Sequence, residues 1–325
     1  MRSKKTIGLL LKIVIVIFAF FFLYQQFTSK RSIEEFDIDN ILLQLQHNYL
    51  LIGIVILMMF LNWFLESLKW RFLISKIEKI SILRSVTAVF SGITVSTFTP
   101  NRVGEYAGRV FCLEKADRIQ GVLITVIGSM SQLLTTIVFG LIGILLLPNL
   151  MPGFEALLTE FVFAYPIMLF VIILLSVLLV ILFLNASLFS VLLSKVKIFS
   201  KFNNYNIVFT FYESSELLEA LLYSVARYVV FTTQFFILLH IFGVDISYID
   251  SIILTTVMLF VISVIPTIAI TEIGVRGSVA LFLFGLVSAN TVGILSATFV
   301  MWIINLLLPA LIGTFFIFTL KFFRK

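Results

Sequence analysis

Long apolar segments separated by short charged stretches dominate the chain. Six of these segments have about 20 residues or more, enough to cross a bilayer core of about 30 Å as helices that rise about 1.5 Å per residue. They are residues 6–27, 49–68, 119–147, 161–184, 217–242 and 291–320. The pattern predicts an all-α integral membrane protein, with six full transmembrane helices in a single polytopic membrane domain over residues 1–325.

Two further apolar runs have a different character. Residues 84–99 are rich in Ser and Thr and are followed by Pro100, and residues 250–265 are followed by Pro266. Each run leads into a short charged patch and then a second helix-like run. We expect two re-entrant broken-helix hairpins, the first at 84–117 and the second at 250–288.

The connecting segments indicate the orientation in the membrane. Acidic residues outnumber basic ones in 28–48, 148–160 and 243–250. Most of the 23 lysines and arginines lie in 1–5, 69–84, 102–118, 185–216 and 321–325. The positive-inside rule then predicts a multi-pass protein with both termini in the cytoplasm, and we expect it in a bacterial-type inner membrane. Six transmembrane crossings place both termini on the same side only if neither 84–99 nor 250–265 adds a single further crossing. Each of these runs is therefore expected to return to the side from which it enters, as a hairpin does.

The two predicted hairpins also resemble each other in sequence. Each proline is followed by an E-x-x-x-R pattern, Glu105 and Arg109 in the first hairpin and Glu272 and Arg276 in the second. The flanking charges predict opposite orientations for the two hairpins. This is the pattern of an inverted repeat with broken helices, which in transporters places substrate sites near the membrane midplane.

Composition narrows the class of protein. The chain is 61% hydrophobic and only 12% charged, whereas soluble domains have about 25% charged residues. The net charge of +6 is not a nucleic-acid footprint, because no long polar stretch could form a solvated basic domain. The single cysteine excludes an internal disulfide and a cysteine-based metal site. Neither His47 nor His240 has ligands at metal-binding spacing, so we expect no metal site and no cofactor.

The charged patch after Pro100 is the main candidate site. A helix that restarts near Gly104 directs free N–H groups and a partial positive charge towards the break. Arg102 and Arg109 add full positive charges, which suits a phosphate or carboxylate. Glu105 lies one turn before Arg109 and can pair with it.

The second hairpin offers an equivalent patch, with its break at Pro266 and Gly274. Glu272 and Arg276 lie there in the corresponding position. Ionisable groups at membrane depth are functional candidates by default. Two other interpretations remain open at this stage: the two Glu–Arg pairs could be structural pins for the hairpins, or Arg102 and Arg109 could be ordinary cytoplasmic loop charges.

Four polar side chains interrupt the full spans. Asn62 and Glu66 lie one helical turn apart, and Arg227 and Gln234 lie two turns apart. Either they line a polar cavity or they form interhelical hydrogen bonds. Arg227 needs a partner at its depth, which Glu66 or Glu272 could supply.

If the hairpins form an inverted pair, their charged tips should share one cleft. We predict that Arg102 or Arg109 lies within about 10–15 Å of Glu272 or Arg276, because one hydrated cleft is less costly than several isolated buried charges.

The motifs resemble those of a known family. The segment TPNRVGEYAGRVFCLEK resembles the P-x-R-x-G-E motif of the flippase-like transmembrane family, which comprises the transmembrane region of lysylphosphatidylglycerol synthases and its free-standing relatives. KWRFLI, at 69–74, is similar to the end of that family's second span, and IPTIAITEIGVRGSVALFLFG to its second signature. The resemblance extends from about residue 6 to 320 and supports the candidate positions, with one departure: the family has Glu directly after the arginine, where this chain has Gly277.

The resemblance implies lipid translocation. Family members that are synthases use a separate soluble domain, which we expect to be absent here, and no P-loop for ATP is found. We therefore expect a protein that flips a lipid with an anionic or zwitterionic head group and is not an enzyme, with a separate lipid-synthesising enzyme as a candidate partner. The alternatives are a membrane enzyme that acts on a lipid-linked phosphate, for which no catalytic residues stand out, and a non-transporting partner subunit.

Overall fold

The structure is a computed structural model that describes residues 38–97, 99, 102–150, 164–185, 208–265 and 269–317. Helices are the regular elements of this part of the chain. They are α2 (Ile38–His47), α3 (Tyr49–Ile74), α4 (Ile82–Thr97), α5 (Gly104–Val110), α6 (Arg118–Leu146), η2 (Leu147–Leu150), α8 (Ala164–Leu184), α10 (Ser214–Ile241), α11 (Tyr248–Val264), α12 (Ala269–Phe284), α13 (Thr291–Trp302), η4 (Ile303–Leu307) and α14 (Leu308–Ile317).

The helices agree with the class predicted from hydropathy. Within the described ranges, four helices are long and apolar enough to cross a membrane: Tyr49–Ile74, Arg118–Leu146, Ser214–Ile241 and Thr291–Phe316. Three shorter apolar helices accompany them, Ile82–Thr97, Phe170–Leu184 and Tyr248–Val264. The predicted first span, residues 6–27, lies outside the described residues. The chain is therefore an α-helical, multi-pass membrane protein.

Local sequence signals explain where several helices begin. The side chain of Asp117 accepts a hydrogen bond from the N–H of Ile119 at the start of α6, and Ser247 accepts one from the N–H of Asp250 at the start of α11. Glu213 and Glu216 form a reciprocal capping box at the start of α10. Each cap satisfies N–H groups that a helix start leaves unpaired.

The first predicted hairpin is a pair of helices, α4 and α5, that begins and ends on the same side of the bundle. Arg84 Nε, at the start of α4, donates to the carbonyl of Cys112, just after α5, at 2.8 Å. The two helices approach closely because both carry glycine at the contact: a Cβ on Gly108 would lie 2.6 Å from the Cα of Gly92. The glycines of the GEYAG segment thus serve close packing within the hairpin.

Glu78 strengthens the base of this hairpin. Its carboxylate accepts hydrogen bonds from the backbone N–H groups of Glu114, Lys115 and Ala116, at 2.9–3.2 Å. Burial alone would raise the pKa of Glu78, but these donors and the nearby charge of Arg84 outweigh it, so the pKa lies below its ordinary value. The loop after α3 is thereby tied to the loop after α5.

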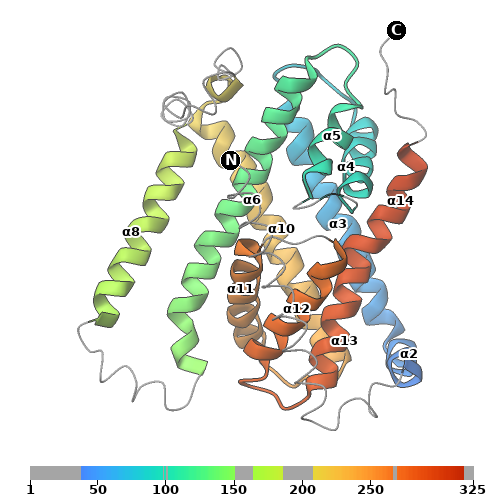
Figure 1. Cartoon of the computed structure of the whole chain (residues 1–325), viewed down its shortest axis with the longest axis vertical. Coiled ribbons are helices and arrows are strands. Elements are labelled where there is room, and N and C mark those ends of the chain that lie inside the picture. The colour runs from blue at the N-terminus through green and yellow to red at the C-terminus, as the bar shows by residue number, and fades with distance from the viewer. Residues whose placement is uncertain are drawn as a thin grey trace, which may run out of the picture.

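The second predicted hairpin, α11 and α12, likewise begins and ends on one side. The side chain of Asn290, after α12, donates to the carbonyls of Phe242 and Gly243, before α11, at 3.1 and 2.9 Å. In Figure 1, α4 and α5 occupy the upper half of the bundle and α11 and α12 the lower half. The two hairpins therefore enter the bundle from opposite ends.

The helix contacts follow the predicted inverted repeat. α4 packs against α14, the last part of the long helix that follows the second hairpin, and α11 packs against α6, the helix that follows the first. Glycines mark both contacts: Gly313 lies against Phe90 of α4, and Gly143 lies against Thr256 of α11. α3 and α10, the helices that precede the hairpins, pack against each other. In these contacts α3, α4 and α6 correspond to α10, α11 and α14.

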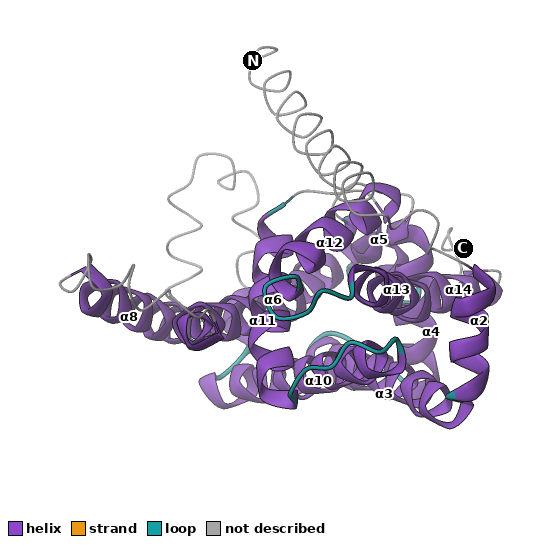
Figure 2. Ribbon diagram, turned by 90° about the horizontal axis from the view of Figure 1, so that it is seen from below, coloured by secondary structure: helices purple, strands orange, loops and turns teal. Residues whose placement is uncertain are grey.

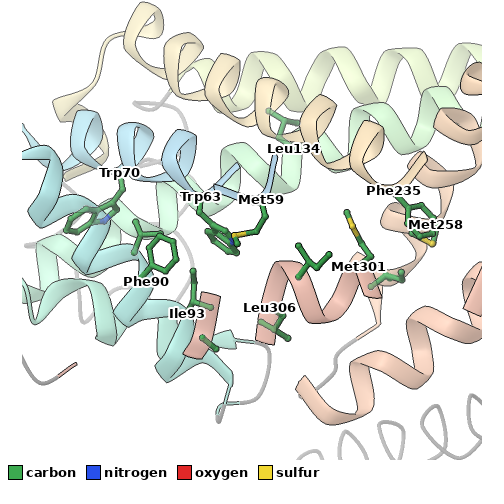
Figure 3. Close-up of a cluster of buried hydrophobic side chains, with 14 of the residues drawn as sticks. Met59, Trp63, Trp70, Phe90, Ile93, Leu134, Phe235, Met258, Met301 and Leu306 are labelled. Carbon is green, nitrogen blue, oxygen red and sulfur yellow. The ribbon is translucent and has the colours of Figure 1, made fainter. Parts of the chain in front are cut away.

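An apolar core fills the space between these helices. Trp63, Trp70 and Phe90 belong to a continuous cluster of buried side chains that extends to Phe235 and Met301 (Figure 3). α8 lies at the edge of the bundle beside α6 (Figure 2), and much of its apolar surface is exposed. An apolar outer surface is what a bilayer requires.

A π-helical turn, η4, interrupts the last long helix. The N–H of Leu308 bonds to the carbonyl of Ile303, five residues earlier. Pro309 explains the wider turn, because it has no N–H to donate to the carbonyl of Asn305. The turn directs the Asn305 side chain to Gln234 Oε1, at 3.0 Å.

Candidate functional site

Arg102 lies in the short linker between α4 and α5, at the inner tip of the first hairpin. Its backbone φ angle is 57°, in the left-handed region that non-glycine residues rarely adopt. The side chain reaches the second hairpin, where Nη2 lies 2.9 Å from both carboxylate oxygens of Glu272. The two hairpin tips therefore meet through an ion pair.

Glu272 lies in the first turn of α12 and is shared by two arginines. Its Oε1 also accepts from Arg276 Nε, at 2.7 Å. The carboxylate is almost fully buried, whereas the Arg102 side chain is 37% exposed. The second tip thus presents a buried carboxylate held between two guanidinium groups, of which that of Arg102 is the more exposed.

A second cluster of charges lies beside the first hairpin. Glu66 of α3 is its centre: the carboxylate pairs with Lys69 at 2.9 Å, with Arg109 at 2.7 Å and with Arg227. Arg109 also pairs with Glu105, one turn away in α5. One buried carboxylate therefore joins cations from three different helices.

Neutral groups complete the coordination of these cations. Arg227 donates to Asn62 Oδ1 at 2.8 Å and to Gln132 Oε1 at 3.1 Å, and its guanidinium lies 5.3 Å from the ring of Trp63. Lys69 Nζ donates to the carbonyl of Gly128 at 3.0 Å. Such partners lower the cost of keeping charges away from water.

Together the two clusters carry more positive than negative charge. The bases are Lys69, Arg102, Arg109, Arg227 and Arg276, and the acids are Glu66, Glu105 and Glu272. The excess is two positive charges. This arrangement can attract and hold an anion, and no group of His, Cys, Asp and Glu that could hold a metal ion occurs among the described residues.

A family model described as the lysylphosphatidylglycerol synthase TM region matches residues 9–313. The chain belongs to this family. No curated protein matches the chain. Membership confirms the resemblance drawn from the motifs and associates this multi-pass membrane protein with lipid handling.

In this member of the lysylphosphatidylglycerol synthase TM-region family, the predicted proximity of the hairpins is confirmed. Arg102 contacts Glu272 directly, well within the expected 10–15 Å. Both Glu–Arg pairs expected from their spacing are also formed, Glu105 with Arg109 and Glu272 with Arg276. In this family member, each pair also has a partner outside its own helix. Arg109 binds Glu66 of α3, and Glu272 binds Arg102 in the linker before α5.

The predicted chain breaks fall close to where helices end. α4 ends at Thr97 and α11 at Val264, and Gly104 is the first residue of α5. Pro100 and Pro266 lie outside the described residues.

The expectation that Gly274 breaks the second hairpin was wrong. α12 begins at Ala269 and continues through Gly274 to Phe284. A single glycine lowers helix stability by only about 1 kcal/mol, and Glu272 in the first turn favours a helix that starts before it.

The polar residues of the full spans form interhelical hydrogen bonds. Asn62 and Glu66 both bind Arg227, which selects Glu66 over Glu272 as its partner. Gln234 lies elsewhere: its side chain bonds the carbonyl of Val55 and the side chain of Asn305. Gln234 therefore links α3, α10 and η4 and does not join the two charged clusters.

Sequence reasoning missed Lys69 and Gln132 as members of the cluster. Lys69 is 1% exposed and lies three residues after Glu66, a spacing at which side chains meet on a helix. That spacing could have identified it. Gln132 carried no such signal, because its partner lies on α10.

Proposed function

We propose that this protein translocates a lipid with an anionic or zwitterionic head group across the cytoplasmic membrane. The proposal rests on the ion pair between Arg102 and Glu272, because this contact joins the tips of two hairpins that enter the bundle from opposite ends. Arg102, Glu105, Arg109, Glu272 and Arg276 would hold the head group there. The acyl chains would stay in the surrounding lipid.

The proposal treats both hairpins as re-entrant segments of one polytopic domain. Non-helical backbone at membrane depth is tolerated only where protein or a water-filled cavity satisfies it, and Arg102 in the linker binds Glu272 of the second hairpin. The paired packing of α4 on α14 and α11 on α6 supports alternating exposure of one central site to the two leaflets. A lipid-synthesising enzyme would supply the substrate, and the chain itself would catalyse no chemical step.

Reconstitution tests this function directly. We expect vesicles that contain the protein to move head-group-labelled phospholipid between leaflets, measured by loss of fluorescence to an impermeant quencher. Protein-free vesicles are the control. Unmoved lipid would contradict the proposal and favour a partner subunit, and chemically altered lipid would favour an enzyme.

The proposed topology has its own test. In a Cys112→Ser background, we expect Lys197→Cys to react with an impermeant thiol reagent from the cytoplasmic side, and Glu155→Cys and Asp245→Cys from outside. This follows from the distribution of lysine and arginine between the connecting segments. Labelling of Glu155→Cys from the cytoplasm would contradict this topology.

A further inference from the structure

The charges of the two clusters indicate the class of lipid that the protein would transport. This inference rests on the proposed function. Five basic side chains and three carboxylates leave two positive charges uncompensated. Excess charge at membrane depth costs several kcal/mol. A head group with net negative charge reduces the excess, a zwitterionic one leaves it unchanged and a cationic one increases it.

Arg102 is the cation best placed to meet an incoming anion. Its side chain is 37% exposed, against 17% for Arg276, 12% for Arg227 and 3% for Arg109. A guanidinium has five N–H donors, and in the described residues Arg102 uses Nη2 alone to bind Glu272. Its other donors can bind a second anion while the ion pair with Glu272 is still intact.

The backbone at Arg102 gives a second, independent observation. A long side chain at a φ of 57° is in a strained conformation, and such strain persists where the surrounding structure over-determines it. Glycine adopts this conformation without cost. The chain nevertheless has arginine here, and the strained linker directs its guanidinium to Glu272.

A phosphate can bind the same guanidinium groups that hold the Glu272 carboxylate. Guanidinium groups bind carboxylates and phosphates in the same planar geometry, and Glu272 lies between Arg102 and Arg276. We propose that the transported lipid has a net negative, phosphate-containing head group, and that its phosphate replaces Glu272 on Arg102. The exchange breaks the ion pair between the hairpin tips, so that head-group binding itself releases one hairpin from the other.

Lipid binding by the whole protein in nanodiscs tests the proposed class. We expect phosphatidic acid and phosphatidylglycerol to bind at least about tenfold more tightly than phosphatidylcholine or a lysine-modified phosphatidylglycerol, a difference of about 1.4 kcal/mol. Native mass spectrometry measures the bound lipid. Equal binding of anionic and zwitterionic lipids would overturn the proposal, even if translocation is observed. Selective binding without translocation would instead remove the proposed function and leave an anionic lipid site.

Inorganic phosphate separates a lipid from a free ion. At equal concentration we expect phosphatidic acid, but not inorganic phosphate, to displace bound phosphatidylglycerol. Displacement by both would mean that the site selects phosphate alone, and would overturn the lipid assignment.

The exchange itself is tested by removing the competing carboxylate. We expect Glu272→Gln to strengthen binding of phosphatidic acid by about tenfold, because Arg102 no longer has an internal partner. Glu216→Gln, which alters the ion pair with Lys76 at the start of α10, is the matched control and should leave binding unchanged. A purely structural bridge predicts weaker or unchanged binding in Glu272→Gln, which would refute the exchange. If that variant does not fold, the lipid preference of the unaltered protein still decides the charge class.

Discussion

Replacement of Arg109 by alanine is expected to remove most of the lipid translocation activity while the protein still accumulates in the membrane. Glu66 keeps Lys69 and Arg227 as partners when Arg109 is removed, and the Glu105 side chain is 22% exposed, so that water can solvate it. The fold therefore tolerates the loss. A hydrogen bond to a charged group contributes about 1.5–3 kcal/mol, so we expect the rate to fall by about 10- to 100-fold.

The measurement is translocation in vesicles, with membrane protein quantified by immunoblot. Lys76→Ala is the matched control, because it removes a cation whose ion pair lies at the helix ends, away from the clusters. If Arg109 is a structural pin, the alanine variant should be lost from the membrane and Glu105→Ala/Arg109→Ala should restore it, since the double variant leaves no unpaired charge.

Replacement of Glu66 by glutamine is expected to have the largest effect on stability. Lys69, Arg109 and Arg227 all pair with this carboxylate and are nearly or largely buried. Without it, Arg109 keeps Glu105 as an ion-pair partner. Lys69 and Arg227 keep only neutral hydrogen-bond partners among the described residues. Loss of one partner from a buried ion pair costs about 3–5 kcal/mol, and we expect an effect of this size on the free energy of unfolding.

Unfolding of the purified protein in detergent, followed by tryptophan fluorescence, measures the change. Trp63 and Trp70 lie on α3 on either side of Glu66 and should report it directly. Glu216→Gln should change stability by less than about 1 kcal/mol, because its ion pair is partly exposed. Glu66→Gln/Lys69→Gln should recover part of the loss. A Glu66→Gln variant as stable as the unaltered protein would show that the cluster does not support the fold.

The two variants separate two roles that the sequence left open. Arg109 pairs with the buried carboxylate of Glu66 and the partly exposed carboxylate of Glu105. We therefore expect the protein to fold without Arg109, although we expect translocation to require it. Glu66 has three cationic partners and its side chain is only 6% exposed, so we expect its first role to be to hold α3, α5 and α10 together. The two variants thus test whether a structural pin and a binding group lie side by side in one cluster.

The sequence by itself determined the features that depend on local spacing. The apolar runs predicted α3, α6, α10 and the last long helix, because hydropathy over about 20 residues alone selects a membrane span. The Glu105–Arg109 and Glu272–Arg276 pairs followed from their spacing of four residues, which brings side chains together on any helix. The charges around residues 84–118 and 243–290 also indicated two hairpins of opposite orientation.

Only the tertiary structure decided which distant residues meet. No spacing in the sequence shows that Arg102 contacts Glu272, 170 residues later, that Arg227 selects Glu66, or that Gln234 binds Asn305 through a π-helical turn. These contacts depend on how the helices rotate and cross, and that is set by the packing of many small and large side chains, such as Gly92 against Gly108. The sequence supplied the charges of the site, and the packing of the helices decided which of them are neighbours.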